Sequence, residues 1–155
     1  MKRHSFALAG AAVFAVSALA AQAGDPEAGA AAFTSQCQNC HNVVNDDGDV
    51  LAGRPNVRTG PNLYGVIGRQ AGTVDGFRYG GSLVEAGEEG LVWDADNMVP
   101  YLLNPQDYLR EVTGDRRARS QMSFRVRDEG TANDIIAFIA SLAPEAEEEE
   151  HAAAD

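Results

Sequence analysis

The segment CQNCH, from Cys37 to His41, has the spacing of a covalent attachment site for c-type haem. Cysteines three residues apart place both sulfur atoms on one face of a helical turn, within reach of two vinyl groups of one haem. The histidine that follows can turn its imidazole onto the iron. We therefore expect Cys37 and Cys40 to hold a haem and His41 to ligate its iron.

Two neighbouring cysteines have other uses in an oxidising compartment. They can form a disulfide or a thioredoxin-like redox pair. A thioredoxin-like site needs a βαβ frame, for which this sequence has no pattern, and a dithiol has no use for His41. Haem attachment accounts for all three residues together, so it is the interpretation that the segment favours.

The candidate residues for the second axial ligand of the iron can be reduced by elimination. Beyond residue 23 the chain contains no lysine, and its remaining histidine, His151, lies in an acidic tail. Two methionines are left. Met98 falls in a helical, apolar stretch where core packing is the expected role, whereas Met122 lies in the non-periodic segment SQMSF. Met122 is the predicted ligand, with ordinary core packing as its alternative role.

Residues 1–23 have the pattern of a cleaved secretory signal peptide. A basic start precedes the apolar run from Phe6 to Ala20, and Ala21-Gln22-Ala23 is a small-residue cleavage site. The apolar run is shorter than the roughly 20 residues of a spanning helix, although an uncleaved anchor is the alternative. We expect export to the bacterial periplasm and a soluble product that begins near Gly24.

The charge of the exported part excludes nucleic acid as a partner. The sequence has 12 basic and 23 acidic side chains; residues 1–23 hold two of the former and none of the latter, which leaves −13 with histidine neutral. A strongly acidic chain repels nucleic acid. Residues 145–155 carry six of the acids without apolar periodicity. We therefore expect a domain over residues 24–144 followed by a disordered acidic tail.

Helix signals frame the expected domain at both ends. Asp25-Pro26-Glu27 combines an N-cap acid, a proline at the first helical position and an acid in the first turn. It predicts a helix that runs to about Cys40. Thr131 and Asp134 resemble a capping box and predict the start of the final helix, which Pro144 ends.

Two further helices are expected before the final one. Asn104-Pro105 opens one of them and Gly114 closes it. The other covers about Asp96 to Leu103, where Pro100 removes a hydrogen bond and so predicts a later or distorted start. Residues 42–90 contain eleven glycines and no strand pattern. A helical turn or two from Ser82 to Glu85, capped by Gly87, is all the regular structure we expect there.

With these residues in place, the chain resembles the class I c-type cytochromes, especially the longer soluble bacterial relatives of mitochondrial cytochrome c. The resemblance covers about Gly24 to Leu142. It implies an all-α, small cytochrome c fold of about four to five helices, with long glycine-rich loops wrapped around one covalently bound haem. Besides CQNCH, the matching segments are GPNLYGVIGR (60–69), GFRY (76–79), LVW (91–93), the region 101–108 and SQMSF (120–124).

The resemblance assigns roles around the iron. It makes His41 and Met122 the axial ligands, the pair that elimination also favours. It implies that the Pro61 carbonyl accepts a hydrogen bond from the other ring nitrogen of His41, which would orient the ring and tune its basicity.

The resemblance also assigns residues around the rest of the haem. Arg69, Tyr79 and Trp93 match positions whose polar atoms bind the haem propionates, and buried carboxylates do need such partners. Tyr101 matches a residue beside the methionine ligand. Four further residues match the crossing of the first and last helices: Gly29, Phe33, Ile135 and Phe138.

An iron held by histidine and methionine has no open position for a substrate. The resemblance therefore implies a monomeric one-electron carrier, not an enzyme, that shuttles between respiratory or photosynthetic complexes. A membrane cytochrome bc-type complex would be the donor, and a terminal oxidase, reaction centre or periplasmic reductase the acceptor. The alternatives are a haem enzyme or gas-binding protein with an open sixth position, and an anchored module of a respiratory complex.

Two departures from familiar members of the family concern docking. Arginine replaces every lysine, and residues 115–119 form an insertion ahead of the methionine. Six arginines against Glu111 and Asp115 give segment 110–127 a net charge of +4. We hypothesise that this basic patch steers partners to the exposed haem edge, with a merely solvated face as the alternative. The arginines are Arg110, Arg116, Arg117, Arg119, Arg125 and Arg127.

Overall fold

The computed structural model describes residues 24–143, so the expected signal peptide and acidic tail lie outside the described residues. This part contains five helices and one antiparallel pair of strands, which confirms the expected helical fold class. No helix within it is long and apolar enough to cross a membrane. The helices are α1 (Pro26–Gln36), α2 (Gly81–Glu88), α3 (Ala95–Leu103), α4 (Pro105–Thr113) and α5 (Glu129–Ser141); the strands are β1 (Asn42–Val44) and β2 (Val50–Gly53).

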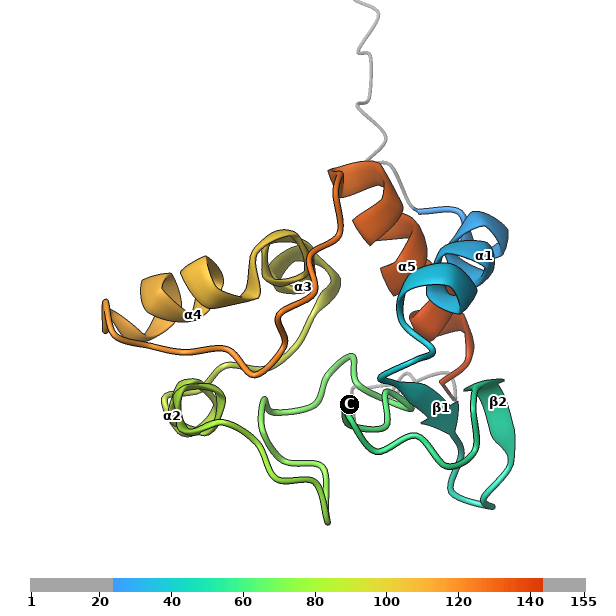
Figure 1. Ribbon diagram of the computed structural model, residues 1–155, viewed down its shortest axis with the longest axis horizontal. Helices are drawn as coiled ribbons and strands as arrows, with labels where there is room; N and C mark the ends of the chain where they lie inside the picture. Colours follow the sequence, from blue (N-terminus) through green and yellow to red (C-terminus); the bar gives the residue numbers. More distant parts are fainter. Residues whose placement is uncertain (1–23, 144–155) are drawn as a thin grey trace, which may run out of the picture.

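The first and last helices cross at one end of the molecule, away from α2 and α4 (Figure 1). Gly29 makes the crossing possible, because a methyl group there would overlap the carbonyl group of Asp134. Beside it, Phe33 is 1% exposed and its ring packs on Phe138 with 5.6 Å between the ring centroids. These contacts are the ones that the resemblance implies, and they join the two ends of the domain.

The ends of these two helices differ from the sequence expectation. α1 ends at Gln36 and not near Cys40, because the N–H groups of Cys37 and Gln38 both donate to the carbonyl of Phe33 and so interrupt the regular ladder. α5 starts earlier than expected. Its N-cap is Asp128, whose carboxylate accepts hydrogen bonds from the backbone N–H of Thr131 (2.8 Å) and from its hydroxyl (3.0 Å). These bonds lower the pKa of Asp128.

The expectation of a late or distorted start for α3 was wrong. A reciprocal capping box sets the start at Ala95: the Asp94 carboxylate accepts from the Asn97 backbone at 2.7 Å, and the Asn97 side chain accepts from the Asp94 backbone at 3.1 Å. Pro100 lies inside the helix on an exposed position. The satisfied cap holds the start even though Pro100 removes one backbone donor. α4 begins after Asn104, as expected.

Residues 42–90 contain more regular structure than expected. β1 and β2 pair as an antiparallel hairpin in which Val43 lies opposite Ala52. Both strands are too short to show an alternating pattern in the sequence. α2 covers Gly81–Glu88, so Gly87 lies inside the helix and does not cap it. A methyl group at Gly87 would overlap the Ala71 carbonyl oxygen, so glycine lets α2 pack closely on that loop.

The buried side chains form two clusters. The larger joins α1, α3 and α5 with the loops, and it contains Met98, which is 6% exposed and so has the core position that its sequence context predicts. The smaller consists of Ala86, Leu109 and Ala118 and joins α2, α4 and the segment after α4. Between the helices and the long loops the chain leaves a space that its own side chains do not fill.

Candidate functional site

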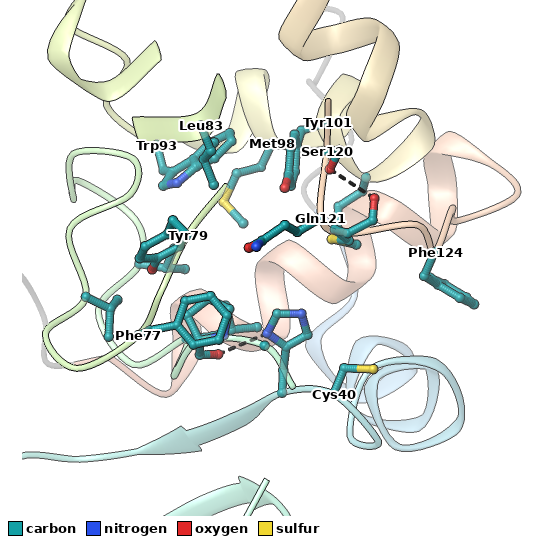
Figure 2. Close-up of a pocket in the computed structure, with 18 of the residues that line it drawn as sticks. Cys40, Phe77, Tyr79, Leu83, Trp93, Met98, Tyr101, Ser120, Gln121 and Phe124 are labelled. Carbon is teal, nitrogen blue, oxygen red and sulfur yellow. Dashed lines mark hydrogen bonds between the residues drawn. The ribbon is translucent and has the colours of Figure 1, made fainter. Parts of the chain in front are cut away.

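A cavity of about 250 Å³ lies among α1, α3, α5 and the loops that follow the β hairpin. Its wall includes every site residue that the sequence analysis named, from Cys37 to Met122. These residues come from segments that are far apart in the chain. Apolar side chains predominate elsewhere in the wall, among them Leu63, Val66, Leu83, Leu102, Ile135 and Ile139. Figure 2 shows the cavity with part of its lining.

The two cysteines border the cavity where α1 unwinds. Cys37 is half-buried and Cys40 is exposed. Burial, with a smaller contribution from the nearby Cys40, raises the pKa of the Cys37 thiol to about 11. Cys37 therefore carries its proton at neutral pH. The turn over residues 37–40 presents two sulfur atoms from neighbouring positions to one cavity, which suits attachment of one planar group at two points.

The imidazole of His41 is held in one orientation. Its Nδ1 donates a hydrogen bond to the Pro61 carbonyl oxygen at 2.9 Å, which leaves Nε2 as the nitrogen available to a metal. Gly60 packs so closely that a methyl group there would overlap the imidazole ring. Burial lowers the pKa of His41, although the bond to Pro61 acts in the opposite direction. The ring is therefore neutral at pH 7, which is the form that binds metals.

Met122 lies half-buried in the cavity wall, in a segment without helix or strand. The Ser120 hydroxyl donates to the Met122 carbonyl at 2.9 Å, the bond drawn near the label of Ser120 in Figure 2. Burial raises the pKa of the neighbouring Tyr101 phenol, while a hydrogen bond with Ser120 partly offsets the rise. Met98 also borders the cavity, from α3. Two thioethers therefore reach the site, one from a helix and one from a loop.

The three residues expected near anionic groups of a ligand lie around the same cavity. The Arg69 guanidinium donates to the backbone carbonyls of Tyr64 and Asn62, so its position is fixed by the loop that carries it. Burial raises the pKa of Tyr79, and a bond to the backbone of Val74 and the charge of Arg69 lower it. Trp93 is 7% exposed, and its ring centroid is 4.8 Å from that of Tyr101.

Several lining residues were not predicted from the sequence. Gln121 extends toward the cavity, and the ring of Phe77 stacks edge-on against Tyr79 with 4.8 Å between centroids (Figure 2). Gly60 was not singled out although it shapes the imidazole site. Ser120 was not singled out either. All four lie in segments that resemble the family, but periodicity and charge do not distinguish them there.

The basic segment is exposed, and only part of it reaches the cavity. Arg119 borders the cavity, whereas Arg110 and Arg117 form exposed ion pairs with Asp107 (3.0 Å) and Asp115 (3.6 Å). Within residues 24–143, the other four arginines have no carboxylate within 4.0 Å. These are Arg116, Arg119, Arg125 and Arg127, all exposed.

The side chains of the cavity wall and the apolar space between them fit one kind of bound group. The wall supplies two thiols, a neutral imidazole with one free nitrogen, a thioether and an arginine beside an apolar space. Imidazole and thioether are nitrogen and sulfur ligands of a transition metal. The chemistry fits a large, flat, mostly apolar metal complex with acidic side groups, as a haem is.

The curated proteins with similar sequences include several cytochromes c2 and c-550. Cytochrome c2 of Cereibacter sphaeroides is 49% identical over 144 residues, which cover 92% of this chain and 98% of that protein. Cytochrome c-550 of Paracoccus versutus is 38% identical over 129 residues, which cover 81% of this chain and 80% of that protein. The comparison with family models gave no match.

Solved structures agree with the sequence comparison. Cytochrome c2 from Rhodobacter sphaeroides superposes with a TM-score of 0.74 and 48% identity, covering 77% of this chain and 96% of the other. Ferric cytochrome c-550 from Paracoccus versutus superposes with a TM-score of 0.72 and 36% identity, covering 78% and 99%. The similarity therefore extends over nearly the whole of each relative and over both sides of the cavity.

Proposed function

Since the chain belongs to the family of cytochromes c2 and c-550, which are class I c-type cytochromes, we propose that His41 and Met122 are the axial ligands of its haem iron. Members of this family are electron carriers and not enzymes, and they bind one haem c through the two cysteines of the motif. The protein accordingly carries electrons between a cytochrome bc1 complex and a reaction centre or oxidase. The haem supplies an iron that exchanges one electron.

One observation supports the ligand assignment above all others. The Nδ1 of His41 is engaged by Pro61, so only Nε2 is free, and the thioether of Met122 reaches the same cavity. Gly60 and Pro61 together hold the imidazole against rotation. A ring that is fixed before it binds metal needs no reorganisation when the electron arrives or leaves.

With His41 and Met122 as its ligands, the haem iron would have no open position for oxygen, peroxide or a gas. Such a closed site would suit electron transfer. Arg69, Tyr79 and Trp93 are proposed to hold the propionates, since all three line the cavity and each side chain carries a hydrogen-bond donor. Burial of those carboxylates needs charged or hydrogen-bonding partners.

Absorption spectra of the purified protein test the ligation. We expect a low-spin ferrous haem c spectrum and the weak red band of methionine-to-iron ligation in the ferric state. The Met122→Ala variant should lose the red band, whereas Met98→Leu, at the other methionine of the wall, should keep it. A high-spin spectrum that changes with carbon monoxide would mean an open site and would overturn the proposal.

We also propose that partners dock on the exposed arginines of segment 110–127. Arg119 at the cavity wall, and Arg116 and Arg125 nearby in sequence, give an acidic molecule a local positive field. Such a field raises the association rate with an acidic partner and is screened by salt. The bc1 complex then meets the molecule on the side where the cavity reaches the surface.

The kinetics of reduction of the protein by a bc1 complex, measured at several ionic strengths, test the docking surface. Arg119→Gln should lower the association rate at low salt by about two- to tenfold, because one favourable charge is lost. Arg54→Gln is the matched control, since Arg54 is exposed but lies in the loop after β2. Equal effects of both variants, or rates that ignore salt, would contradict the proposal.

The proposed setting is the bacterial periplasm, where the protein works as a soluble monomer. Residues 1–23 support it, because they have the composition and cleavage pattern of a signal peptide. Mass spectrometry of the protein purified from its host should give a chain that begins near Gly24. A retained leader would instead make it an anchored carrier.

A further inference from the structure

The segment that carries Met122 has no regular structure to hold it. It leaves α4 through Gly114, whose φ of 67° turns the chain, and it reaches α5 only at Glu129. A residue in such a segment keeps its place only through individual contacts with other elements. The insertion at residues 115–119 contains two of these contacts, and the electron-transfer function does not account for them.

The first contact is made by the side chain of Ala118. It is 1% exposed although both of its neighbours, Arg117 and Arg119, are exposed. Its methyl group packs with Ala86 of α2 and Leu109 of α4 in the smaller buried cluster. A turn directs it inward, in which the Ala118 N–H donates to the Asp115 carbonyl at 2.9 Å.

The second contact is a hydrogen bond between the backbone of the insertion and α2. The N–H of Arg119 donates to the Ser82 hydroxyl at 3.0 Å, across 37 positions of sequence. Gly80 leaves room for the segment, since a methyl group there would lie 3.1 Å from the Gln121 side chain. α2 is itself seated closely on the Ala71 loop through Gly87, so it offers a firm support.

These contacts lie directly before the methionine. Ser120 follows Arg119, and its hydroxyl donates to the Met122 carbonyl at 2.9 Å. On the far side, Val126 is 3% exposed and its N–H donates to the Leu102 carbonyl at 2.9 Å. The segment around Met122 therefore contacts α2 and α4 just before the methionine and α3 just after it.

We propose that Ser82 and Ala118 are positioning residues for Met122: they anchor the insertion to α2 and α4 and so hold the thioether at the sixth coordination position. The inference rests on the proposed ligation by Met122. Loss of either contact lets the segment move away from the cavity and exposes that position. The insertion is then a structural support for the ligand as well as part of the basic segment.

Imidazole is the probe, because it binds ferric haem only when the methionine has left. Its apparent association constant is proportional to the fraction of molecules in which the segment is open. The Ser82→Ala variant removes the acceptor of one hydrogen bond, so imidazole should bind about fivefold more tightly. Loss of the red ferric band during the titration reports displacement of the methionine.

A matched pair of variants separates positioning from stability. Ser82→Thr keeps the hydroxyl and should restore the imidazole affinity of the unchanged protein. Ile136→Val is the control for general destabilisation, since Ile136 is 3% exposed in α5 and does not line the cavity. It should lower the thermal unfolding midpoint without changing imidazole affinity, whereas Ser82→Ala should change the affinity with little change in the midpoint.

Ala118→Leu tests the first contact, the packing of Ala118 on Ala86 and Leu109, because the buried site has no space for three more carbon atoms. Imidazole affinity should rise about tenfold or more. If Ser82→Ala and Ala118→Leu change the affinity no more than Ile136→Val does, the positioning role is wrong. If the unchanged protein lacks the red ferric band, the ligation by Met122 has failed, and the two failures are thereby distinguished.

Discussion

The α1–α5 crossing and the segment that carries Met122 are stabilised by different kinds of contact. At the crossing, two helices pack backbone against backbone at Gly29, and the rings of Phe33 and Phe138 close the contact. Segment 114–126 is held by buried side chains at Ala118 and Val126, by the partly buried Met122 and by single hydrogen bonds.

The two regions should differ in how far the effect of a mutation extends through the fold. Removal of an atom from the crossing affects the whole folded state, because the two ends of the domain meet there. Removal of a contact from segment 114–126 affects only that segment, since its neighbours keep their own packing. Contacts in the second region should therefore matter most for the position of Met122, the proposed ligand, whereas contacts at the crossing should matter most for the free energy of unfolding.

The largest effect should come from Phe33→Ala, which empties the centre of the crossing. Phe33 is 1% exposed, and such a truncation costs about 3–5 kcal/mol of unfolding free energy. Denaturant unfolding followed by circular dichroism measures it. Val50→Ala is the control, because Val50 is 40% exposed and its truncation should cost less than about 0.5 kcal/mol. Similar costs for the two would mean that the crossing does not dominate stability.

A smaller loss is expected when Gly29 receives a methyl group. Gly29→Ala forces α1 away from the Asp134 carbonyl, and overpacking of this kind costs about 1–3 kcal/mol. The same denaturant titration measures it. Gly81→Ala is matched in chemistry but meets nothing within 4 Å, so it should leave stability unchanged or slightly higher. An unaffected Gly29→Ala protein would show that the helices can separate without cost.

The next effect should remain local to the Met122 segment. Val126→Ala removes about 1–2 kcal/mol of apolar burial where the segment meets α3. Amide hydrogen exchange at Val126 should accelerate about tenfold, while the central amides of α5 keep their rates. Uniform acceleration throughout the chain would instead make this segment part of one cooperative unit with the crossing.

The smallest effect should be the pH dependence of the α5 N-cap. Bonds to Thr131 lower the folded-state pKa of Asp128, so its contribution is present above the unfolded value of roughly 3.9 and is lost as the pH falls through the folded value. Asp128→Asn should therefore be less stable than the unchanged protein near neutral pH, and the difference should shrink in acid. Thermal melts at several pH values measure it. If the stability difference between the two proteins instead grew as the pH falls, the predicted stabilising effect of the ionised Asp128 would be wrong.

Haem attachment was predicted correctly from the sequence, whereas ligation of the iron by His41 stays a prediction. The spacing of Cys37 and Cys40 needs no tertiary information, because both residues lie within one helical turn. The N-caps at Asp25 and Asn104 work in the same way, since the cap and the N–H groups that it accepts are neighbours in sequence. Elimination favoured Met122 because few ligand types occur after residue 23.

The misjudged features depended on distant partners or on several competing signals. The hairpin of β1 and β2 was missed, because three or four residues show no period until a partner strand lies alongside. Gly87 was taken for a helix cap, although it serves the approach of α2 to Ala71. The α3 start was placed too late, because the Asp94 and Asn97 box outweighs the cost of Pro100.

Covalent haem attachment and the family could be inferred from the amino-acid sequence, since both rest on residue types at short spacing. The glycine that positions His41 and the side chains that support the Met122 segment became apparent only from the folded structure. Gly60 touches the imidazole from another loop, and Ser82 reaches Arg119 across 37 positions. Such contacts follow from how the whole chain packs around the cavity, and no local pattern of charge or hydrophobicity encodes them.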